Sequence, residues 1–276
     1  MSRLLVCSEH DIPSVNMRAQ LHSKVKWEDL GSDGKNNYCV YGNDIMLSTP
    51  DIHIYAESID DVAKKFGITI DDIIFMSKHK AASAIPTLTV HPIGNYKKAD
   101  FGGKAETLVK STPELMTDSL RRIAATNDTQ YKVSFEVTHH GPYVDVPTMF
   151  IEIGSDESCW GDVHAAEILA NVIGTMEKND YLNVVGIGGG HYAPRFTEIS
   201  LKYKVNFGHM VPNYQLENAS DDEVIRMIRS ATEATSTKVV YLHRRSMKKS
   251  EIIHICDLAE STGLEIVSSK DLEPLV

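Results

Sequence analysis

Short apolar runs alternate with helical patterns from one end of the chain to the other. Apolar runs of roughly four to eight residues are typical of buried strands, whereas apolar residues spaced three and four apart are typical of amphipathic helices. The alternation predicts an α/β fold, a three-layer sandwich with a central mixed, largely parallel sheet. We expect a hairpin over residues 38–48 and strands over residues 3–8, 72–77, 87–92, 131–139, 148–153, 182–190, 206–210, 238–243 and 265–269.

Capping residues mark several helix boundaries. Thr112 followed by Pro113 is a typical helix start, as is Ser220 before an apolar-periodic segment. Ser58 and Gly67 bracket a further segment with start and stop signals. We expect helices over residues 13–24, 57–67, 112–126, 157–177, 220–234 and 248–262, and one opened by Pro194. Residues 93–111 form a long polar link, which we interpret as a functional loop rather than a domain linker.

Composition narrows the class of protein. The 276 residues are 42% hydrophobic and 24% charged, which is ordinary for a globular protein, and we expect one domain over residues 1–276. The net charge of −10 excludes a uniformly basic surface for coating nucleic acid, and DNA is not an expected partner. Four cysteines without a CxxC pair argue against a cysteine zinc site or a disulfide framework. With no signal peptide or long apolar run, we expect a soluble, cytoplasmic protein without a membrane partner.

Chemistry first enters at FEVTHHGP, residues 135–142, where a strand pattern ends in two adjacent histidines. If the strand continued to its end, alternation would place His139 on one face and Glu136 with His140 on the other. Four more histidines follow other apolar runs, so six of the twelve fall at expected strand ends. Sites in open α/β sheets form at the carboxyl ends of strands. The additional four are His79, His91, His191 and His209.

Histidines and carboxylates without cysteine allow two kinds of chemistry. Glu136 and Glu152 are the candidate carboxylates. Together with the imidazoles they suit a hydrolytic zinc that keeps one position open for water. Alternatively, imidazoles and Arg195 position water and stabilise an oxyanion directly. Both readings remain open at this point.

The segment VVGIGGGHYAPR combines a glycine turn with a helix start. Gly188, Gly189 and Gly190 allow close approach of a ligand, and the helix opened by Pro194 favours anions. The spacing is neither GxGxxG nor a P-loop, which excludes those two nucleotide-binding motifs. A basic run over residues 238–249 is either a solvated face or a phosphate contact, and the lysines of the 93–111 loop allow the same two interpretations.

Taken together, four motifs resemble the archaeal and plant type of D-aminoacyl-tRNA deacylase, also called D-tyrosyl-tRNA deacylase. They are SKHKAASAIPTLTVHPIGN, FEVTHHGP, FIEIGSDESCW and GIGGGHYAPRFTE, and the resemblance covers nearly the whole chain. It implies hydrolysis of the ester between a D-amino acid and tRNA, a zinc cofactor, and a fold similar to peptidyl-tRNA hydrolases and nucleoside phosphorylases. This chain departs from the family pattern at Lys78, where the family has arginine, and at Ala81 and Ala82, where a serine-bearing stretch is usual.

The resemblance also suggests roles. We expect His139 or His140, oriented by Glu136, to act as base or zinc ligand. The backbone near Gly141 would reject L-amino acids, and the expected partner is the acceptor end of tRNA, bound by a monomer. His191 and the amides of residues 188–190 would contact the oxyanion or the ribose. Arg195 would bind the terminal phosphate, and Lys78 would bind another part of the substrate. The candidate metal ligands are His79, His91, His140 and Glu152.

Two alternatives stay open. One is a nucleoside phosphorylase or nucleosidase, because the expected fold is similar and Arg195 beside a glycine-rich strand end suits phosphate. The other is a non-catalytic tRNA-binding module that uses the basic run. The acidic net charge predicts weak, salt-sensitive binding of tRNA confined to its acceptor end.

Overall fold

The larger of two main sheets is built mostly from the first half of the chain. The computed structural model describes residues 2–61, 66–82 and 84–275. Eight strands pair in the order β2-β3-β4-β1-β5-β10-β6-β9. β1, β4, β5 and β10 run parallel, whereas β6 is antiparallel to β10 and parallel to β9. The strands are β1 (Arg3–Ser8), β2 (Glu28–Ser32), β3 (Asn37–Tyr41), β4 (Asp44–Thr49), β5 (Asp72–Lys78), β6 (Thr87–His91), β9 (Lys132–Phe135) and β10 (Thr148–Gly154).

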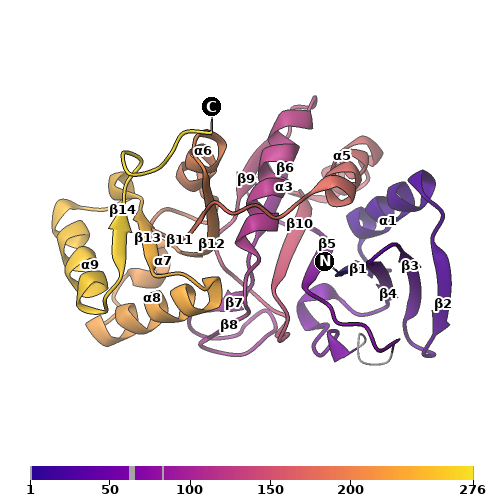
Figure 1. Ribbon diagram of the computed structural model, residues 1–276, viewed down its shortest axis with the longest axis horizontal. Coiled ribbons are helices and arrows are strands. Elements are labelled where there is room, and N and C mark those ends of the chain that lie inside the picture. Colours follow the sequence, from indigo (N-terminus) through magenta and orange to yellow (C-terminus); the bar gives the residue numbers. More distant parts are fainter. Residues whose placement is uncertain (1, 62–65, 83, 276) are drawn as a thin grey trace.

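A second, smaller sheet is formed by the last third of the chain. Its four strands are all parallel and follow the order β12-β11-β13-β14. The two sheets lie side by side along the longest axis of the molecule, and a short ribbon of β7 and β8 lies between them (Figure 1). These strands are β7 (Gly94–Asn95), β8 (Thr107–Leu108), β11 (Leu182–Ile187), β12 (Val205–Val211), β13 (Val239–Leu242) and β14 (Glu265–Val267).

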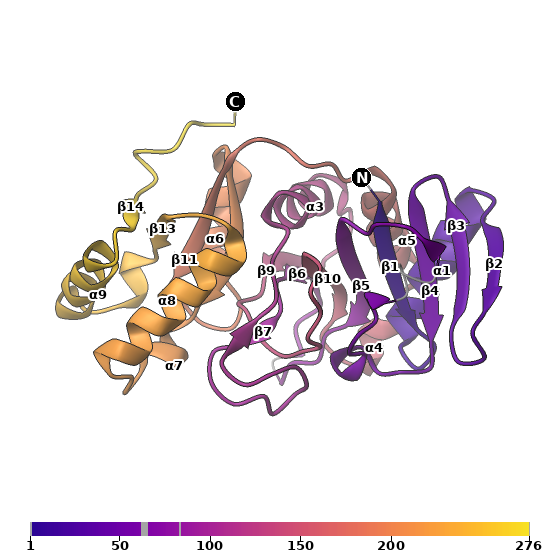
Figure 2. The ribbon, with the colours of Figure 1, turned by 60° about the horizontal axis from the view of Figure 1, so that its bottom comes forward.

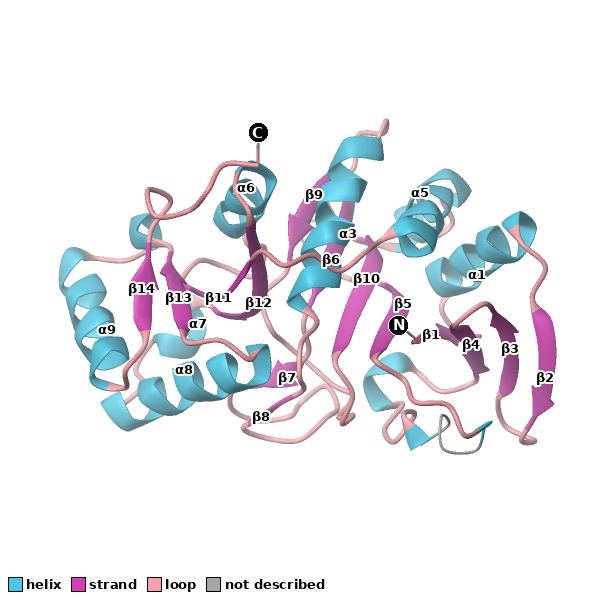
Figure 3. Cartoon of the chain, viewed as in Figure 1, coloured by secondary structure: helices cyan, strands magenta, loops and turns pink. Residues whose placement is uncertain are grey.

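Helices separate most of the strands (Figure 3), and two of their starts carry signals that the sequence indicated, although Thr112 itself makes no side-chain cap hydrogen bond. Pro113 occupies the first turn of its helix, and Ser220 forms a reciprocal capping box with Glu223. The helices are α1 (Ile12–Lys24), α3 (Pro113–Thr126), α4 (Glu157–Trp160), α5 (Val163–Thr175), α6 (Pro194–Lys202), α7 (Asn213–Leu216), α8 (Asp221–Thr235) and α9 (Lys249–Ser261), with 3-10 turns η1 (His53–Tyr55) and η2 (Arg244–Ser246).

The core joins the two sheets. Helices α1, α3 and α5 bury their apolar faces on one side of the large sheet, and α3 lies over β6 and β9 (Figure 2). The same core includes Phe207 and Met210 of β12, because α3 also packs against that strand. The opposite side of the large sheet has its own apolar cluster around Phe75 and Phe150, which includes residues of 56–59, 66–70 and 93–109. This second side carries the candidate site.

The predicted fold class is confirmed: the sheets are mixed and largely parallel, and helices pack against them. The strands divide between two sheets, which the expected single central sheet did not anticipate. The expected helix over 157–177 is broken at Gly161, after which Asp162 caps α5. The helix expected over 57–67 includes residues 62–65, which lie outside the described residues. No helix in the described part of the chain is long and apolar enough to span a membrane.

The strand expected over 131–139 ends at Phe135 instead. Beyond it, Val137 N–H donates to the carbonyl of His191, and Ala193 N–H donates to the carbonyl of Phe135. Glu136 N–H still donates to the Val90 carbonyl of β6, so the segment after Phe135 also pairs on its other edge with the residues that follow β11, through an isolated bridge between Glu136 and Tyr192. This additional pairing brings the FEVTHHGP and GGGHYAPR motifs together.

Candidate functional site

Seven side chains from five segments converge on the second side of the large sheet. We call them the histidine–glutamate cluster. His91, at the end of β6, lies opposite Phe150 and therefore diagonal to Glu152 on the same face of β10. β6 runs parallel to β9, so His91 shares a carboxyl edge with Glu136, His139 and His140, as the sequence suggested. Because β6 runs antiparallel to β10, that shared edge does not extend to Glu152. The members are His79, His91, Glu136, His139, His140, Glu152 and His191.

Glu136 is at the centre of one half of the cluster. Its carboxylate is fully buried, and its Oε2 lies 3.1 Å from His79 Nδ1 and 3.0 Å from His191 Nε2. His139 Nε2 lies 3.6 Å from the same oxygen. One carboxylate oxygen thus faces three imidazoles, two of which come from segments far apart in the sequence.

Glu152 joins the other half. Its Oε2 lies 3.5 Å from both His79 Nδ1 and His91 Nε2. His79 therefore bridges the two buried carboxylates, and its Nε2 lies 3.0 Å from the hydroxyl of Tyr192. The backbone of His79 is held in place because Trp160 donates its indole N–H to the His79 carbonyl at 2.9 Å.

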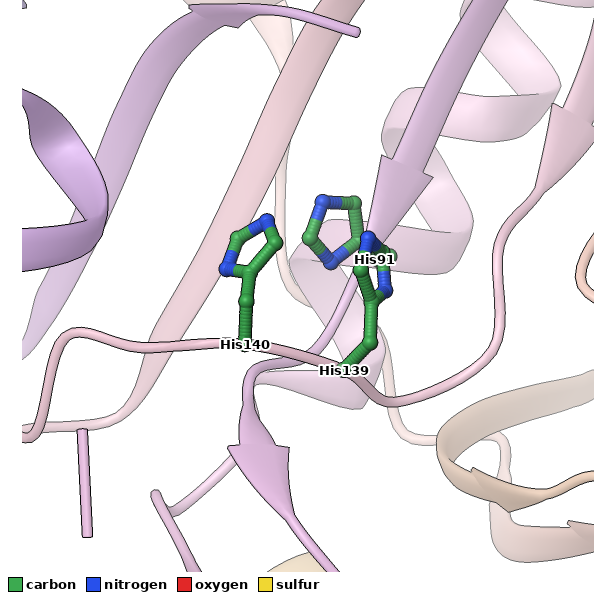
Figure 4. Close-up of side chains that lie close together, drawn as sticks. All are labelled: His91, His139 and His140. Atoms are coloured by element: carbon green, nitrogen blue, oxygen red, sulfur yellow. The ribbon is translucent and has the colours of Figure 1, made fainter. Parts of the chain in front are cut away.

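Three imidazoles of the cluster, those of His91, His139 and His140, face one another (Figure 4). Ring centroids are 4.3 Å apart for His91 and His139 and for His139 and His140. Each Nδ1 lies within hydrogen-bond distance of a backbone carbonyl: Pro92 at 3.1 Å, Val137 at 2.7 Å and Gly141 at 2.6 Å, respectively. A proton on each Nδ1 leaves the Nε2 lone pair available, which is the arrangement that orients imidazole ligands around a metal.

Electrostatics divides the histidines into two kinds. Burial lowers the pKa of His139 well below its usual value, helped by the nearby imidazoles, and lowers the pKa of His140 to about 4. Burial acts in the same direction on His79 and His91, but the negative charge of Glu152, 3.5 Å from each ring, outweighs it and raises the pKa of each. His139 and His140 are thus neutral at pH 7, which is the form that binds metals.

The two glutamates stay ionised despite their burial. Desolvation acts to raise the pKa of Glu136, but the hydrogen bond from His191 and the neighbouring imidazoles outweigh it, so the pKa is lower than usual. Burial also acts to raise the pKa of Glu152, but its close contacts with His79 and His91 hold that pKa well below its usual value. The cluster therefore holds two negative charges, both on buried carboxylates.

Several buried polar atoms of the cluster have no hydrogen-bond partner among the described residues. They are Nε2 of His91, Oε1 of Glu136 and Oε2 of Glu152. Leaving such atoms unpaired costs about 1–3 kcal/mol each, so a native cluster of them calls for an occupant. Three sets of side chains bring potential ligand atoms within 4.8 Å of one another: His91, His139 and His140; His79, Glu136 and His191; His91, Glu136 and Glu152. Nitrogen and oxygen ligands of this kind suit zinc.

A family model described as D-aminoacyl-tRNA deacylase matches residues 66–267, a range that includes the whole cluster. The chain belongs to the D-aminoacyl-tRNA deacylase family. It is 36% identical to the D-aminoacyl-tRNA deacylase of Methanococcoides burtonii over 99% of this chain and 58% of that protein. It is 32% identical to the D-aminoacyl-tRNA deacylase of Methanosarcina mazei, over 97% of this chain and 92% of the relative.

A solved structure resembles this family member over its full length. The crystal structure of AF0625, a conserved protein of unknown function, has a TM-score of 0.87 and 31% identity, and covers 100% of this chain and 99% of its own. The likeness extends across both sheets, so the arrangement that brings residues 135–141 beside 191–193 belongs to a fold already observed by crystallography.

Not every residue that the sequence indicated lies in the cluster of this family member. The ammonium group of Lys78 lies 4.9 Å from the centre of the Trp160 ring. The guanidinium of Arg195 donates to Glu198 at 2.8 Å and to the hydroxyl of Tyr241 at 2.9 Å. Neither contact involves the cluster, and the expected roles of Lys78 and Arg195 in binding substrate stay predictions.

The backbone amides of the glycine turn after β11 donate hydrogen bonds within the protein. Gly188 N–H donates to the carbonyl of Val211 at 2.8 Å, and Gly189 N–H donates to Asn213 Oδ1 at 3.1 Å. These two amides are therefore not available to an oxyanion in this conformation, so that part of the hypothesis finds no support. Gly190 is exposed, and its contact with substrate stays a prediction.

Two other sequence features take ordinary structural places. His209 lies inside β12 rather than beyond it, fully buried, with Nδ1 3.0 Å from Thr138 Oγ1 and Nε2 2.8 Å from the Val109 carbonyl. The basic run contributes Arg245 and Lys248 to a cavity of about 750 Å³ beside α7 and α9. Whether that run contacts tRNA stays a prediction.

Sequence reasoning missed two tyrosines near the cluster. Tyr192 contacts His79 through its hydroxyl, and its position next to His191 in a quoted motif was the available signal. Tyr214 of α7 keeps 44% of its surface exposed, and desolvation together with the charge of Glu136 raises its pKa to about 12. No pattern in the sequence around Tyr214 pointed to this proximity.

Proposed function

We propose that this chain hydrolyses the ester that joins a D-amino acid to the terminal ribose of tRNA, releasing the free amino acid and tRNA. Family membership supports the activity. The observation that carries the proposal is the buried cluster of five imidazoles and two ionised carboxylates, within which several polar atoms have no partner among the described residues. An activated ester requires a positioned water, a proton acceptor and charge stabilisation, all of which such a cluster can supply.

His191 is the general base in this proposal. It is the most exposed imidazole of the cluster, with 38% of its side chain accessible, and Glu136 orients its Nε2 at 3.0 Å. Among the described residues no partner holds its Nδ1, which is thus left for water. Nδ1 accepts a proton as the water oxygen bonds to the ester carbonyl carbon. When the bond from carbon to the ribose oxygen breaks, the imidazolium returns that proton to the leaving oxygen.

Zinc is the proposed cofactor, and His91, His139 and His140 would hold it. Their Nδ1 atoms face backbone carbonyls and their rings converge, which leaves three Nε2 lone pairs for one ion and a fourth position open. The ion would supply Lewis acidity at the ester. This set of ligands differs from the one expected from sequence, because it includes His139 and does not include His79 or Glu152.

Chirality would be read by backbone beside His140. A Cβ built on Gly141 would lie 2.2 Å from Gly103 N and 2.8 Å from the Ile54 carbonyl, so three chain segments meet there without room for a side chain. Backbone packed this closely forms a rigid wall, which moves little when a ligand approaches. An L-amino acid, whose side chain would point at this wall when its ester is correctly placed, would be excluded.

The deciding assay compares hydrolysis of D-Tyr-tRNA and L-Tyr-tRNA, each with and without a chelator. We expect only the D-ester to be hydrolysed, with loss of activity on chelation and recovery with zinc. Equal rates for both esters would contradict the chirality proposal. D-selective turnover that is indifferent to chelator would remove zinc from the mechanism.

Zinc content provides a readout independent of turnover. The His140→Asn variant should retain little zinc after purification, whereas a His209→Asn control should retain the wild-type amount, because His209 lies outside the cluster. If neither ester is hydrolysed by the wild-type protein, phosphate-dependent cleavage of nucleosides and binding of uncharged tRNA without turnover are the two alternatives to test.

A further inference from the structure

The loop between β7 and β8 is firmly tied to the body of the protein. Asn95 Nδ2 donates to the carbonyl of Gly102 at 2.9 Å, and Glu106 N–H donates to the carbonyl of Lys97 at 2.8 Å. From outside the loop, Arg226 of α8 donates to the Tyr96 carbonyl at 3.2 Å. The loop therefore has a defined conformation although it contains little regular structure.

One end of this loop is packed directly beside the cluster. Gly141 N–H, next to His140, donates to the carbonyl of Phe101 at 3.0 Å. Gly102 has φ +75°, and a Cβ there would lie 1.8 Å from the Ile54 carbonyl. Only glycine allows the loop, η1 and the end of the histidine motif to approach backbone to backbone. The position of Phe101 is consequently fixed relative to His140.

Two large aromatic side chains are left in solvent at this junction. Phe101 is 66% exposed and Tyr55 of η1 is 57% exposed. Gly102, the residue after Phe101, lies against Tyr55, because a Cβ there would lie 3.3 Å from the Tyr55 ring. Two exposed aromatic side chains on a firmly held junction form a candidate contact surface, since exposed apolar area rimmed by polar residues is typical of interaction sites.

The basic residues of the loop favour an anionic partner. Lys98 and Lys104 are exposed and Lys97 is half-buried, against two acids, Asp100 and Glu106, of which Glu106 is already paired with an arginine of α8. Lysine is depleted in interfaces between proteins, which argues against a second copy of the chain as the occupant. Aromatic rings interleaved with lysines are the usual surface for unpaired nucleotides, whose bases stack while their phosphates meet the cations.

We propose that Phe101 and Tyr55 form a stacking platform for the unpaired bases at the 3′ end of the substrate RNA. This rests on the proposed function, since the esterified ribose must reach the cluster while the preceding nucleotides pass over its rim. The platform lies at that rim, beside His140 and Gly141. It binds by stacking and charge, so it holds the end of the RNA without reading its sequence through base edges.

The kinetic test uses Phe101→Ala with D-Tyr-tRNA and with D-tyrosyl-adenosine, which lacks the preceding nucleotides. We expect KM for the tRNA to rise about tenfold, the effect of losing one stacked base, with little change in kcat. The small ester should be unaffected, and Phe101→Trp should restore the wild-type KM. Tyr41→Ala is the matched control, because Tyr41 is an exposed aromatic on β3, remote from the cluster in sequence and contacts. An unchanged KM for tRNA in Phe101→Ala would overturn the proposal.

A binding measurement separates this proposal from the activity. Fluorescence of the Phe101→Trp variant should be quenched by a single-stranded RNA ending in CCA and much less by a blunt duplex. Quenching without hydrolysis of any ester by wild-type protein would leave the platform standing and overturn the proposed function. A concentration-dependent dimer in wild type that Phe101→Ala abolishes would identify a second copy of the chain as the occupant, and would overturn the platform.

Discussion

The histidine–glutamate cluster and the glycine turn after β11 are adjacent in the molecule, yet their polar atoms are used differently. In the turn, Gly188 N–H donates to Val211, and Gly189 N–H donates to both Asn213 and Ser246. In the cluster, buried atoms such as Oε1 of Glu136 have no partner among the described residues. Hydrogen bonds that the protein completes by itself stabilise the fold, whereas buried atoms left incomplete mark the place where a ligand contributes.

The same distinction holds within one residue type. His91 and His209 are both fully buried. His209 has partners for both ring nitrogens, Thr138 and the Val109 carbonyl, whereas His91 has a carbonyl only for Nδ1. We therefore assign His91 to the site and His209 to the core, and the predictions below test that assignment.

The largest expected effect is that of Glu136→Gln. Removing the charge that orients His191 should lower kcat/KM for D-Tyr-tRNA by roughly 10³-fold, within the range typical of acid–base groups, while the fold persists. Asp72→Asn is the matched control, because Asp72 is equally buried but pairs with Lys178 at 2.7 Å, outside the cluster. A loss of similar size in Asp72→Asn, or of less than tenfold in Glu136→Gln, would contradict the role given to Glu136.

The next effect concerns stability and pH. Burial lowers the pKa of His209 to about 4, so between pH 6.5 and 4 the unfolded state binds a proton there that the folded state does not. Its contribution to the free energy of unfolding is present above pH 6.5 and falls by roughly 3 kcal/mol as the pH decreases to 4.

Urea unfolding of wild type and His209→Gln across this range isolates the contribution of His209, since other buried histidines act equally in both proteins. The variant should lose less stability on acidification than wild type, and glutamine can still donate to the Val109 carbonyl. Parallel pH profiles would show that His209 is not a neutral, satisfied core residue.

The sequence predicted the parts of this molecule that depend on neighbouring residues. The Gly42-Asn43 hairpin, the Ser220 cap and the Pro113 helix start are all present, because each is determined by a few adjacent side chains. Histidines at strand ends also led to most of the cluster. The assumption of a shared carboxyl edge holds between His91 and the motif that follows β9, but not between His91 and β10, which runs antiparallel to β6.

What the sequence could not provide is contact between distant segments. Glu136 and His191 meet because the segment after Phe135 pairs on its free edge with residues 191–193, and no local pattern encodes that pairing. His140 has φ +44°, which breaks strand alternation, and His139 and His140, expected on opposite faces, both contact His91. Tyr214 approaches the cluster from α7, which only tertiary packing determines.

The smallest expected effect tests the glycine turn itself. Gly189 has φ +90°, so Gly189→Ala should lower the free energy of unfolding by about 1–2 kcal/mol through backbone strain. Gly190→Ala is the matched control for stability, since Gly190 has no left-handed φ and open space at its Cβ position. If the turn is structural, kcat/KM in Gly189→Ala stays close to wild type under conditions where the variant is folded. A large loss of kcat, with stability no lower than expected, would instead mean that the turn opens during the reaction and that its amide contacts the developing oxyanion after all.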